Sequence, residues 1–255
     1  MNDELRAVNS GFALQVERLY TQLIAFAGPE PTSAPESELP LGGKLLFAGE
    51  FNSQSRAAVV AASIAGAASL AVSRDSATQR EAIHDGIIDF SVNSLDEALR
   101  ILKNEIRKRQ PVAVCLALPA GASIADFEQE LHERGVVPDL AGPDLTETGL
   151  PEPRGALLQW SVASAEHLWL PRLEALAAAT LEPGETAARQ WLRLAPRYLG
   201  RLAQGVRLLR CREESAARFL AELHLRVESG EIAVAIEVRQ EVRGQISLHR
   251  FSPAS

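Results

Sequence analysis

Residues 43–75 read GKLLFAGEFNSQSRAAVVAASIAGAASLAVSRD, and their apolar and small side chains follow a regular plan. A short apolar run, Leu45–Ala48, ends at Gly49, and a second apolar run covers Ser69–Val72. Between the two runs, residues 54–65 are rich in small side chains and predict a helix. Strand, turn, helix and strand within about 30 residues is the order of a βαβ unit.

The turn after the first apolar run lacks most of the glycines that a dinucleotide-binding unit uses. It reads GEFNSQSR over residues 49–56, and only Gly49 is in place. The missing glycines would let the backbone approach a pyrophosphate and would pack the helix against the strand. Side chains at Phe51 and Asn52 are expected to collide with the phosphates, and Glu50 is expected to repel them. The sequence therefore predicts a Rossmann-like scaffold whose usual contact with NAD is lost.

The composition is that of a soluble globular chain of one or two domains. Its 255 residues are 46% hydrophobic and 23% charged, which allows a large core. A formal net charge of -7 argues against a general nucleic-acid or anionic-membrane binder. Two cysteines make no disulfide framework, no run is apolar enough to span a bilayer, and the N-terminus lacks the order of a signal peptide. We therefore expect a cytoplasmic protein without membrane contact.

Strands and helices are predicted to alternate as far as about residue 150. An amphipathic helix over residues 4–27 comes first, followed by a linker rich in Pro, Ser and Glu over residues 29–40. Beyond the βαβ unit, strands are predicted at residues 88–92, 112–118 and 139–141, and helices at residues 77–85, 95–108 and 124–134. Short apolar strands separated by helices imply a parallel sheet covered on both faces.

The pattern changes after residue 150. A strand is predicted at residues 155–163, and helices are predicted at residues 165–179 and 185–202. Residues 213–227 fit either a helix or a strand. An antiparallel hairpin is predicted from Ile232 to Leu248, with its turn at Arg243-Gly244. The predicted organisation is therefore an N-terminal helix and linker (1–40), a three-layer α/β Rossmann-like domain (41–150), and a C-terminal extension of helices and a hairpin (151–255).

The ordered motifs of residues 42–149 resemble the NAD-binding region of urocanase (urocanate hydratase). The matching pieces are Gly43-Lys44, Ala48-Gly49, Asp75, Asp89, SLDEAL at residues 94–99 and RGVVPD at residues 134–139. In that family the bound NAD is an electrophile to which the substrate imidazole adds before water does. The resemblance covers less than half of the chain and implies the Rossmann-like domain only.

Several residues depart from the urocanase pattern. Ser73 stands where the family has the glutamate that is expected to hold the ribose hydroxyls, and DLTETG at residues 144–149 replaces a segment that carries a histidine. The regions that hold the catalytic tyrosine and cysteine of urocanase have no counterpart that we identify in this chain. We therefore expect no hydratase activity from this chain alone.

Three interpretations of function remain. The first is a non-catalytic urocanase-like Rossmann protein with a binding or assembly role. The second is a protein or enzyme component that binds NAD, NADP or another nucleotide through side chains. The third is a urocanate hydratase-related lyase that needs a partner chain. The five histidines show no metal-ligand spacing, and we assign neither catalytic nor metal-binding residues.

The second interpretation names a set of candidate cofactor-binding residues around the two strand ends. They are Gly49, Asn52, Ser53, Ser55, Arg56, Ser73 and Arg74. The start of a helix attracts anions, and an arginine after the second strand suits a 2′-phosphate. The alternative is that Asn52 or Ser53 is simply a helix N-cap and Arg74 a solvated surface charge.

A second feature is a basic face on the helix predicted over residues 185–202. Arg189, Arg193, Arg197 and Arg201 recur every four residues, and no acidic residue lies between Arg189 and Arg212. Like charges at this spacing repel on an isolated helix. The face therefore predicts contact with a protein partner or a second copy, or else ion pairs with acidic residues of the same chain.

Overall fold

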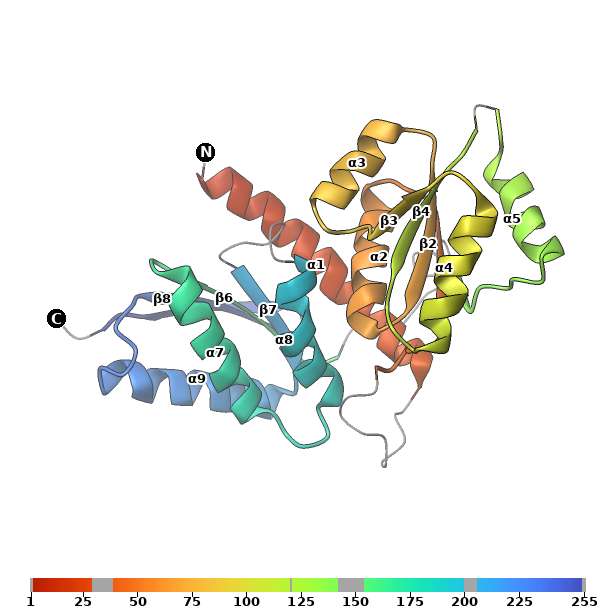
Figure 1. Ribbon diagram of the computed structural model, residues 1–255. Helices are drawn as coiled ribbons and strands as arrows, with labels where there is room; N and C mark the ends of the chain where they lie inside the picture. The colour runs from red at the N-terminus through yellow and green to blue at the C-terminus, as the bar shows by residue number, and fades with distance from the viewer. Residues whose placement is uncertain (1, 29–38, 120, 142–153, 200–205, 254–255) are drawn as a thin grey trace. The chain divides into compact units, whose positions relative to one another are not determined.

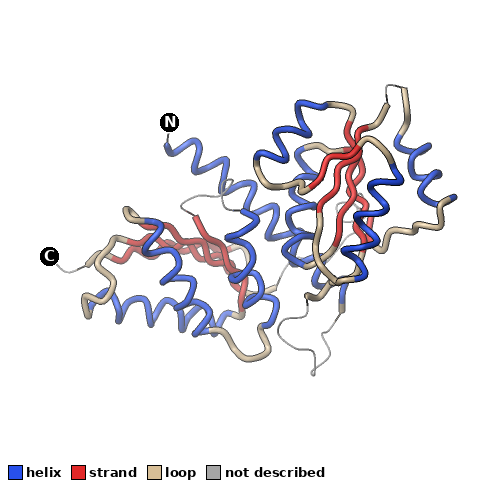
Figure 2. Tube along the Cα trace, in the orientation of Figure 1, coloured by secondary structure: helices blue, strands red, loops and turns tan. Residues whose placement is uncertain are grey.

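The chain divides into two units, each built around a sheet of its own (Figures 1 and 2). The computed structural model describes residues 2–28, 39–119, 121–141, 154–199 and 206–253. One unit comprises residues 18–151, and the other comprises residues 1–17 and 152–255. Helix α1 (Asn2–Ala27) therefore contributes residues to both units. Among the described helices, none combines the length and apolar content that crossing a bilayer requires.

Within residues 18–151 the described strands and helices form a Rossmann-like α/β unit. Its sheet is wholly parallel, in the order β3-β4-β2-β1-β5. The strands are β1 (Leu45–Glu50), β2 (Ala68–Ser73), β3 (Phe90–Val92), β4 (Ala113–Ala117) and β5 (Leu140–Ala141), and the helices between them are α2 (Ser53–Ala65), α3 (Ser76–His84), α4 (Leu95–Arg107) and α5 (Ile124–Glu133). The predicted fold class is confirmed.

Helices cover both faces of this parallel sheet (Figure 2). On one face, alternate strand residues meet α4 and α5; examples are Phe47, whose ring lies 5.8 Å from that of Phe127, and Leu70. On the other face α2 packs through small buried side chains such as Ala57 and Ala61. All six residues of β2 are buried, as expected of a central strand that helices cover on both faces.

Local signals fix where the helices of this unit begin and end. Asp75, Ser94 and Ser123 cap the starts of α3, α4 and α5 through their side-chain oxygens. Helix α2 ends at Gly66, whose φ is +94°. A Cβ at Gly66 would stand 2.2 Å from Cβ of Leu39, so this position needs glycine for its backbone angle and for space.

The second unit is an antiparallel sheet in the order β7-β6-β8-β9 with helices packed on it. The strands are β6 (Ala156–Val162), β7 (Val206–Cys211), β8 (Ile236–Val242) and β9 (Gln245–Phe251), and the helices are α7 (Glu166–Thr180), α8 (Thr186–Leu199) and α9 (Glu213–Glu228). Trp160 of β6 is fully buried against Phe219 of α9, with the ring centroids 5.4 Å apart.

The structure extends the predicted C-terminal hairpin into a four-stranded sheet. The hairpin itself is confirmed as β8 and β9, with positive φ at Arg243 and Gly244 in the turn. Its first strand begins at Ile236, so the predicted start at Ile232 was wrong. Residues 213–227 are helical, and β7 was not predicted at all.

Candidate functional site

The turn from β1 into α2 is the centre of the candidate nucleotide site. Asn52 is the N-cap of α2, and its Oδ1 accepts hydrogen bonds from the amides of Gln54 (2.9 Å) and Ser55 (3.0 Å). In return, the Asn52 amide donates to Ser55 Oγ at 2.7 Å. Amides at the start of a helix are the donors that an anion would use. In this turn Asn52 Oδ1 already accepts from two of them, the amides of Gln54 and Ser55.

The rest of this turn is held close to the sheet. The Phe51 amide donates to Val72 O at 2.7 Å, and the Phe51 side chain is 5% exposed. Ser55 Oγ donates to Glu50 O at 2.9 Å, which ties the first turn of α2 to the end of β1. Glu50, Asn52, Ser53 and Gln54 are the exposed polar residues of the turn. Phe51, which was expected to collide with a pyrophosphate, is therefore a buried core side chain. The exposed surface of the turn is polar.

Arg74 lies at the end of β2 and links three segments of the unit. Its guanidinium donates to Glu50 Oε1 at 2.9 Å and to the carbonyl of Ala122 at 2.7 Å. The first contact holds the ends of β1 and β2 together, and the second reaches the loop before α5. Both charged side chains of the pair are partly exposed. A phosphate that approached Arg74 would have to compete with Glu50 for it.

Ser73 and Arg56 form hydrogen bonds with residues outside the turn. Ser73 is buried, and its Oγ accepts from the amide of Asp75 at 3.1 Å. Arg56 donates to Asp85 at 2.6 Å and to Glu81 at 3.2 Å. These contacts direct Arg56 to α3 and the residue that follows it. The structure thus brings together Gly49, Asn52, Ser53 and Ser55 in one turn, with Arg74 joined to it through Glu50, and leaves Arg56 and Ser73 outside.

This order of parallel strands and helices agrees with the comparison with protein families. Residues 36–148 match the urocanase Rossmann-like domain. The resemblance inferred from the motifs is therefore confirmed, and it is limited to that domain. The urocanase-like domain keeps the βαβ scaffold with Gly49 at a left-handed φ of +72°. Asn52 caps α2 in the turn that follows Gly49.

Acidic residues near the strands of the urocanase-like domain hold backbone in place. The side chain of Asp75 caps α3; hydrogen bonds from the Thr78 hydroxyl and from the amides of Ala77 and Thr78 lower its pKa. Asp139 precedes β5 and accepts from Lys44 Nζ (2.8 Å) and from the Leu45 amide (2.9 Å). These carboxylates have structural partners, which leaves them poorly placed as acid–base groups.

The two cysteines do not supply a nucleophile. Cys115 lies in β4 and Cys211 ends β7, and both side chains are buried. Burial raises the pKa of each thiol to about 12, so the reactive thiolate is scarce near neutral pH. Within the described ranges, no group of three or more His, Cys, Asp or Glu side chains is placed to hold a metal ion.

The basic face of α8 is only partly available for an outside partner. Arg189 donates to the carbonyls of Ala178 (3.0 Å) and Leu181 (2.7 Å), so it caps the end of α7. Arg193 and Arg197 are exposed, and the Arg197 guanidinium lies 5.4 Å from the ring centroid of Tyr198. Arg201 lies outside the described residues.

Two further arginines of the acid-free stretch pair within their unit. Arg207 donates to Glu174 of α7 at 2.5 Å, and Arg210 binds both carboxylate oxygens of Glu17 at 2.8 and 2.9 Å. Burial raises the pKa of Glu174, although Arg207 acts against it. Intramolecular pairing thus accounts for these arginines.

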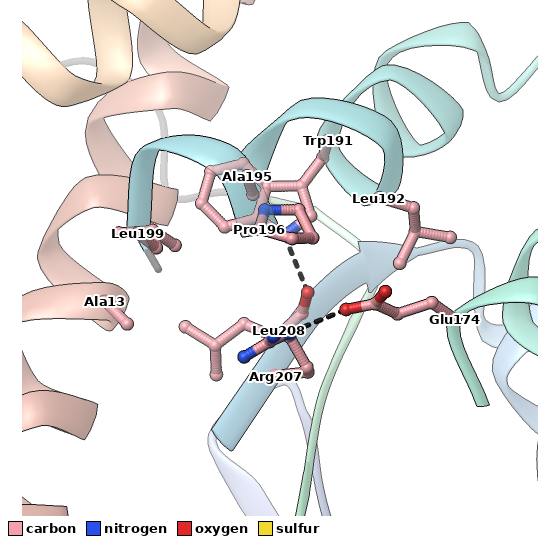
Figure 3. Close-up of a pocket in the computed structure, with 9 residues that line it drawn as sticks. All are labelled: Ala13, Glu174, Trp191, Leu192, Ala195, Pro196, Leu199, Arg207 and Leu208. Carbon is pink, nitrogen blue, oxygen red and sulfur yellow. Dashed lines mark hydrogen bonds and ion pairs between the residues drawn. The ribbon is translucent and has the colours of Figure 1, made fainter. Parts of the chain in front are cut away.

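A small cavity lies between α8 and β7, with the Glu174–Arg207 pair at its border (Figure 3). Its other walls are apolar side chains of α8, Leu208 and Ala13 of α1. Trp191 Nε1 donates to the Leu208 carbonyl at 2.6 Å. The cavity volume is about 10 Å³, which is room for roughly one water molecule. It is a packing space at the edge of the sheet, too small for an organic ligand.

Proposed function

We propose that this protein is a non-catalytic, urocanase-related Rossmann protein with a binding or assembly role. The observation that carries the proposal is the Asn52 cap on α2. In a dinucleotide site the pyrophosphate takes hydrogen bonds from the first amides of this helix. Here Asn52 Oδ1 accepts from the Gln54 and Ser55 amides. A bound pyrophosphate would have to displace that side chain before it gained a comparable contact.

The charges around the turn support the same proposal. Glu50 ends β1, and its carboxylate is half-exposed beside the start of α2. A diphosphate at this turn would meet a like charge at short range. It would also have to take Arg74 from Glu50, with which Arg74 pairs at 2.9 Å. Both requirements oppose the tight NAD binding on which hydratase chemistry depends.

Thermal unfolding of the full chain with NAD+, NADP+ or urocanate tests the proposal. A ligand that binds only the folded state raises the Tm. We expect no change in Tm with any of the three at millimolar concentration. A rise with NAD+ together with turnover of urocanate would overturn the non-catalytic assignment.

Nucleotide binding is a second candidate, which two features of the turn favour. Gly49 has a left-handed φ, and no atom lies within 4 Å of a Cβ built there. The Arg74 side chain is 42% exposed, so NADP+ could offer its 2′-phosphate to it. This candidate predicts a larger rise in Tm with NADP+ than with NAD+, lost in Arg74→Ala. Arg80→Ala, on α3, is the matched control and should keep the rise.

For the assembly role, we propose contact between an acidic partner and the exposed arginines of α8, Arg193 and Arg197. Both residues are exposed, whereas Arg189 is half-buried and caps α7. Reversing both charges with Arg193→Glu and Arg197→Glu should abolish an assembly that depends on this face. Sedimentation velocity of the full chain and of the double variant, each mixed with poly-L-glutamate as a model acidic partner, measures this directly; co-sedimentation that both charge reversals leave unchanged would exclude the face.

A further inference from the structure

The edge strand β9 presents apolar side chains and open backbone groups to the solvent. β9 lies at the end of the antiparallel sheet and, within the described part of the chain, is hydrogen-bonded to a strand on one side only, β8. Two of its large apolar side chains are exposed, Ile246 at 58% and Leu248 at 50%. The β8–β9 register places them on one face of the strand, together with Arg250.

Other sheet edges in the described part of the chain are short or covered. β3 and β5 are three and two residues long. At the far side of the antiparallel sheet, α8 packs along β7 and Trp191 donates to the outward carbonyl of Leu208. β9 is seven residues long, pairs with β8 without a shift in register, and contains neither proline nor lysine. Natural proteins protect an edge of this kind, because it is a template for pairing with another strand.

The hairpin geometry identifies which backbone groups of β9 face outward. Arg243 and Gly244 both have positive φ, as in the two-residue type I′ turn. In such a hairpin the flanking residues, Val242 and Gln245, form a hydrogen-bonded pair, and alternate pairs along the strands follow suit. The amides and carbonyls of Ile246, Leu248 and Arg250 therefore point away from β8. The open edge and the exposed apolar side chains belong to the same residues.

We propose that β9 pairs antiparallel with β9 of a second copy of this chain, about a two-fold axis at Ser247. This register places Ile246 of each copy opposite Leu248 of the other, and Ser247 opposite Ser247. An axis at Leu248 would place Ile246 opposite Arg250, and an axis at Ile246 would leave Leu248 opposite Gly244. Only the axis at Ser247 gives both apolar side chains an apolar partner.

The charges on the neighbouring strand fit the same register. Arg239 lies beside Leu248 and Glu241 lies beside Ile246 on β8. Across the two copies, each row of side chains then runs Arg239, Leu248, Ile246, Glu241, with opposite charges at its ends. No like charges stand opposite each other between the two β9 strands, and the β9 edge is self-complementary, as an isologous interface must be. That self-complementarity is why we assign a second copy of this chain as the occupant.

This dimer goes beyond the proposed function and does not depend on it, because it involves none of residues 36–148. It also differs from assembly through Arg193 and Arg197. Sedimentation velocity of the full chain over a range of concentrations should show a reversible dimer. Leu248→Lys adds a charge to the edge and should weaken the dimer by about tenfold or more. Leu225→Lys, at a leucine of α9 that is at least as exposed as Leu248, is the matched control and should leave the dimer intact, as should the Arg193→Glu, Arg197→Glu double variant.

Cysteine cross-linking tests the register. Residues opposite each other in a non-hydrogen-bonded pair have Cα atoms about 4.5 Å apart, within disulfide range. Ser247→Cys should therefore form a disulfide-linked dimer on mild oxidation, while Gln245→Cys should not. The native Cys115 and Cys211 are buried and do not interfere. A full chain that stays monomeric at all concentrations, a dimer unaffected by Leu248→Lys, or failure of Ser247→Cys to cross-link would each overturn the proposal.

Discussion

Asn52 shows how one side chain can change what a helix start offers to a ligand. A glycine loop leaves the first amides of the helix open, whereas a capping residue uses them internally. In this chain Asn52 and Ser55 form a reciprocal capping box. The box stabilises the start of α2 through the chain's own side chains. The same residues that stabilise the scaffold are the ones that we propose weaken anion binding.

Replacement of Asn52 should therefore show whether its hydrogen bonds to the helix amides prevent anion binding. Asn52→Gly removes the side-chain acceptor at a cost of only a few tenths of a kcal/mol, because glycine is itself tolerated at an N-cap. We expect pyrophosphate at millimolar concentration to raise the Tm of Asn52→Gly more than that of the parent chain. Ser94→Gly, at the N-cap of α4, is the control. An equal response in the two variants would contradict the role of the Asn52 cap.

Glu185 is a buried carboxylate that joins the loop between α7 and α8 to the start of α9. It accepts from the Arg212 amide (2.6 Å), the Glu182 amide (2.8 Å) and Ser215 Oγ (2.5 Å). Burial acts to raise its pKa, but these hydrogen bonds outweigh burial and lower it from the ordinary value of 4.5. Glu185→Gln should lower the free energy of unfolding by about 1–3 kcal/mol at pH 7.

The pH dependence of that loss has a defined sign. Because the pKa of Glu185 is lower in the folded state, its stabilising contribution is complete above about pH 4.5 and is lost as the pH falls through the folded pKa. Urea unfolding at pH 7 and at pH 3.5 should therefore show a smaller difference between parent and variant at the lower pH. Glu214→Gln, at an exposed neighbouring position, should change little at either pH.

Ser69 is a polar residue in the core whose hydroxyl makes no hydrogen bond with the described residues. It is fully buried in β2, and its Oγ has no hydrogen-bond partner among the described residues. Removing an unsatisfied buried hydroxyl avoids a desolvation penalty. Ser69→Ala should leave the free energy of unfolding unchanged or raise it by up to about 1 kcal/mol, measured by urea unfolding. A loss above about 1 kcal/mol would show that the hydroxyl has a partner.

At the scale of elements, the sequence predicted the α/β unit closely because its signals are local. Apolar runs bounded by capping residues such as Asp75 and Ser123 mark strand and helix ends within a few positions. β7 was missed because Arg207 and Arg210 interrupt its apolar pattern. Their partners, Glu174 and Glu17, lie 33 and 193 residues away, and no local pattern reveals such pairs.

In the candidate site, too, local contacts could be predicted from the sequence and long-range contacts could not. The cap at Asn52 was foreseeable, since Asn followed by a small-residue helix is a common N-cap signal. The contacts of Arg56 and Arg74 were not, because they join α2 to Asp85 and β2 to Ala122 across 29 and 48 residues. Tertiary geometry decides whether an arginine faces a ligand or a neighbouring element, and sequence spacing does not carry that information.

The end of α2 offers a test of how backbone angle and space combine at one glycine. Gly66 and Gly86 both have left-handed φ, but a Cβ stands 2.2 Å from Leu39 at Gly66 and meets nothing within 4 Å at Gly86. Gly86→Ala should cost about 1 kcal/mol, the backbone strain alone. Gly66→Ala should cost about 2 kcal/mol or more, because Leu39 must also move. Equal costs in chemical denaturation would contradict the clash.

At the scale of the whole molecule, α1 sets how the chain can be divided. Residues 18–27 belong to the α/β unit of residues 18–151, and Leu19, Tyr20 and Leu23 in this segment are buried. A fragment of residues 18–151 keeps these side chains, and a fragment of residues 39–151 loses them. Each large apolar side chain contributes about 1.5–3 kcal/mol when buried. We expect the longer fragment to unfold cooperatively and the shorter one to be less stable by about 3 kcal/mol or more in urea. Equal stability of the two fragments would mean that the unit is complete without α1, in line with a domain that begins near residue 41.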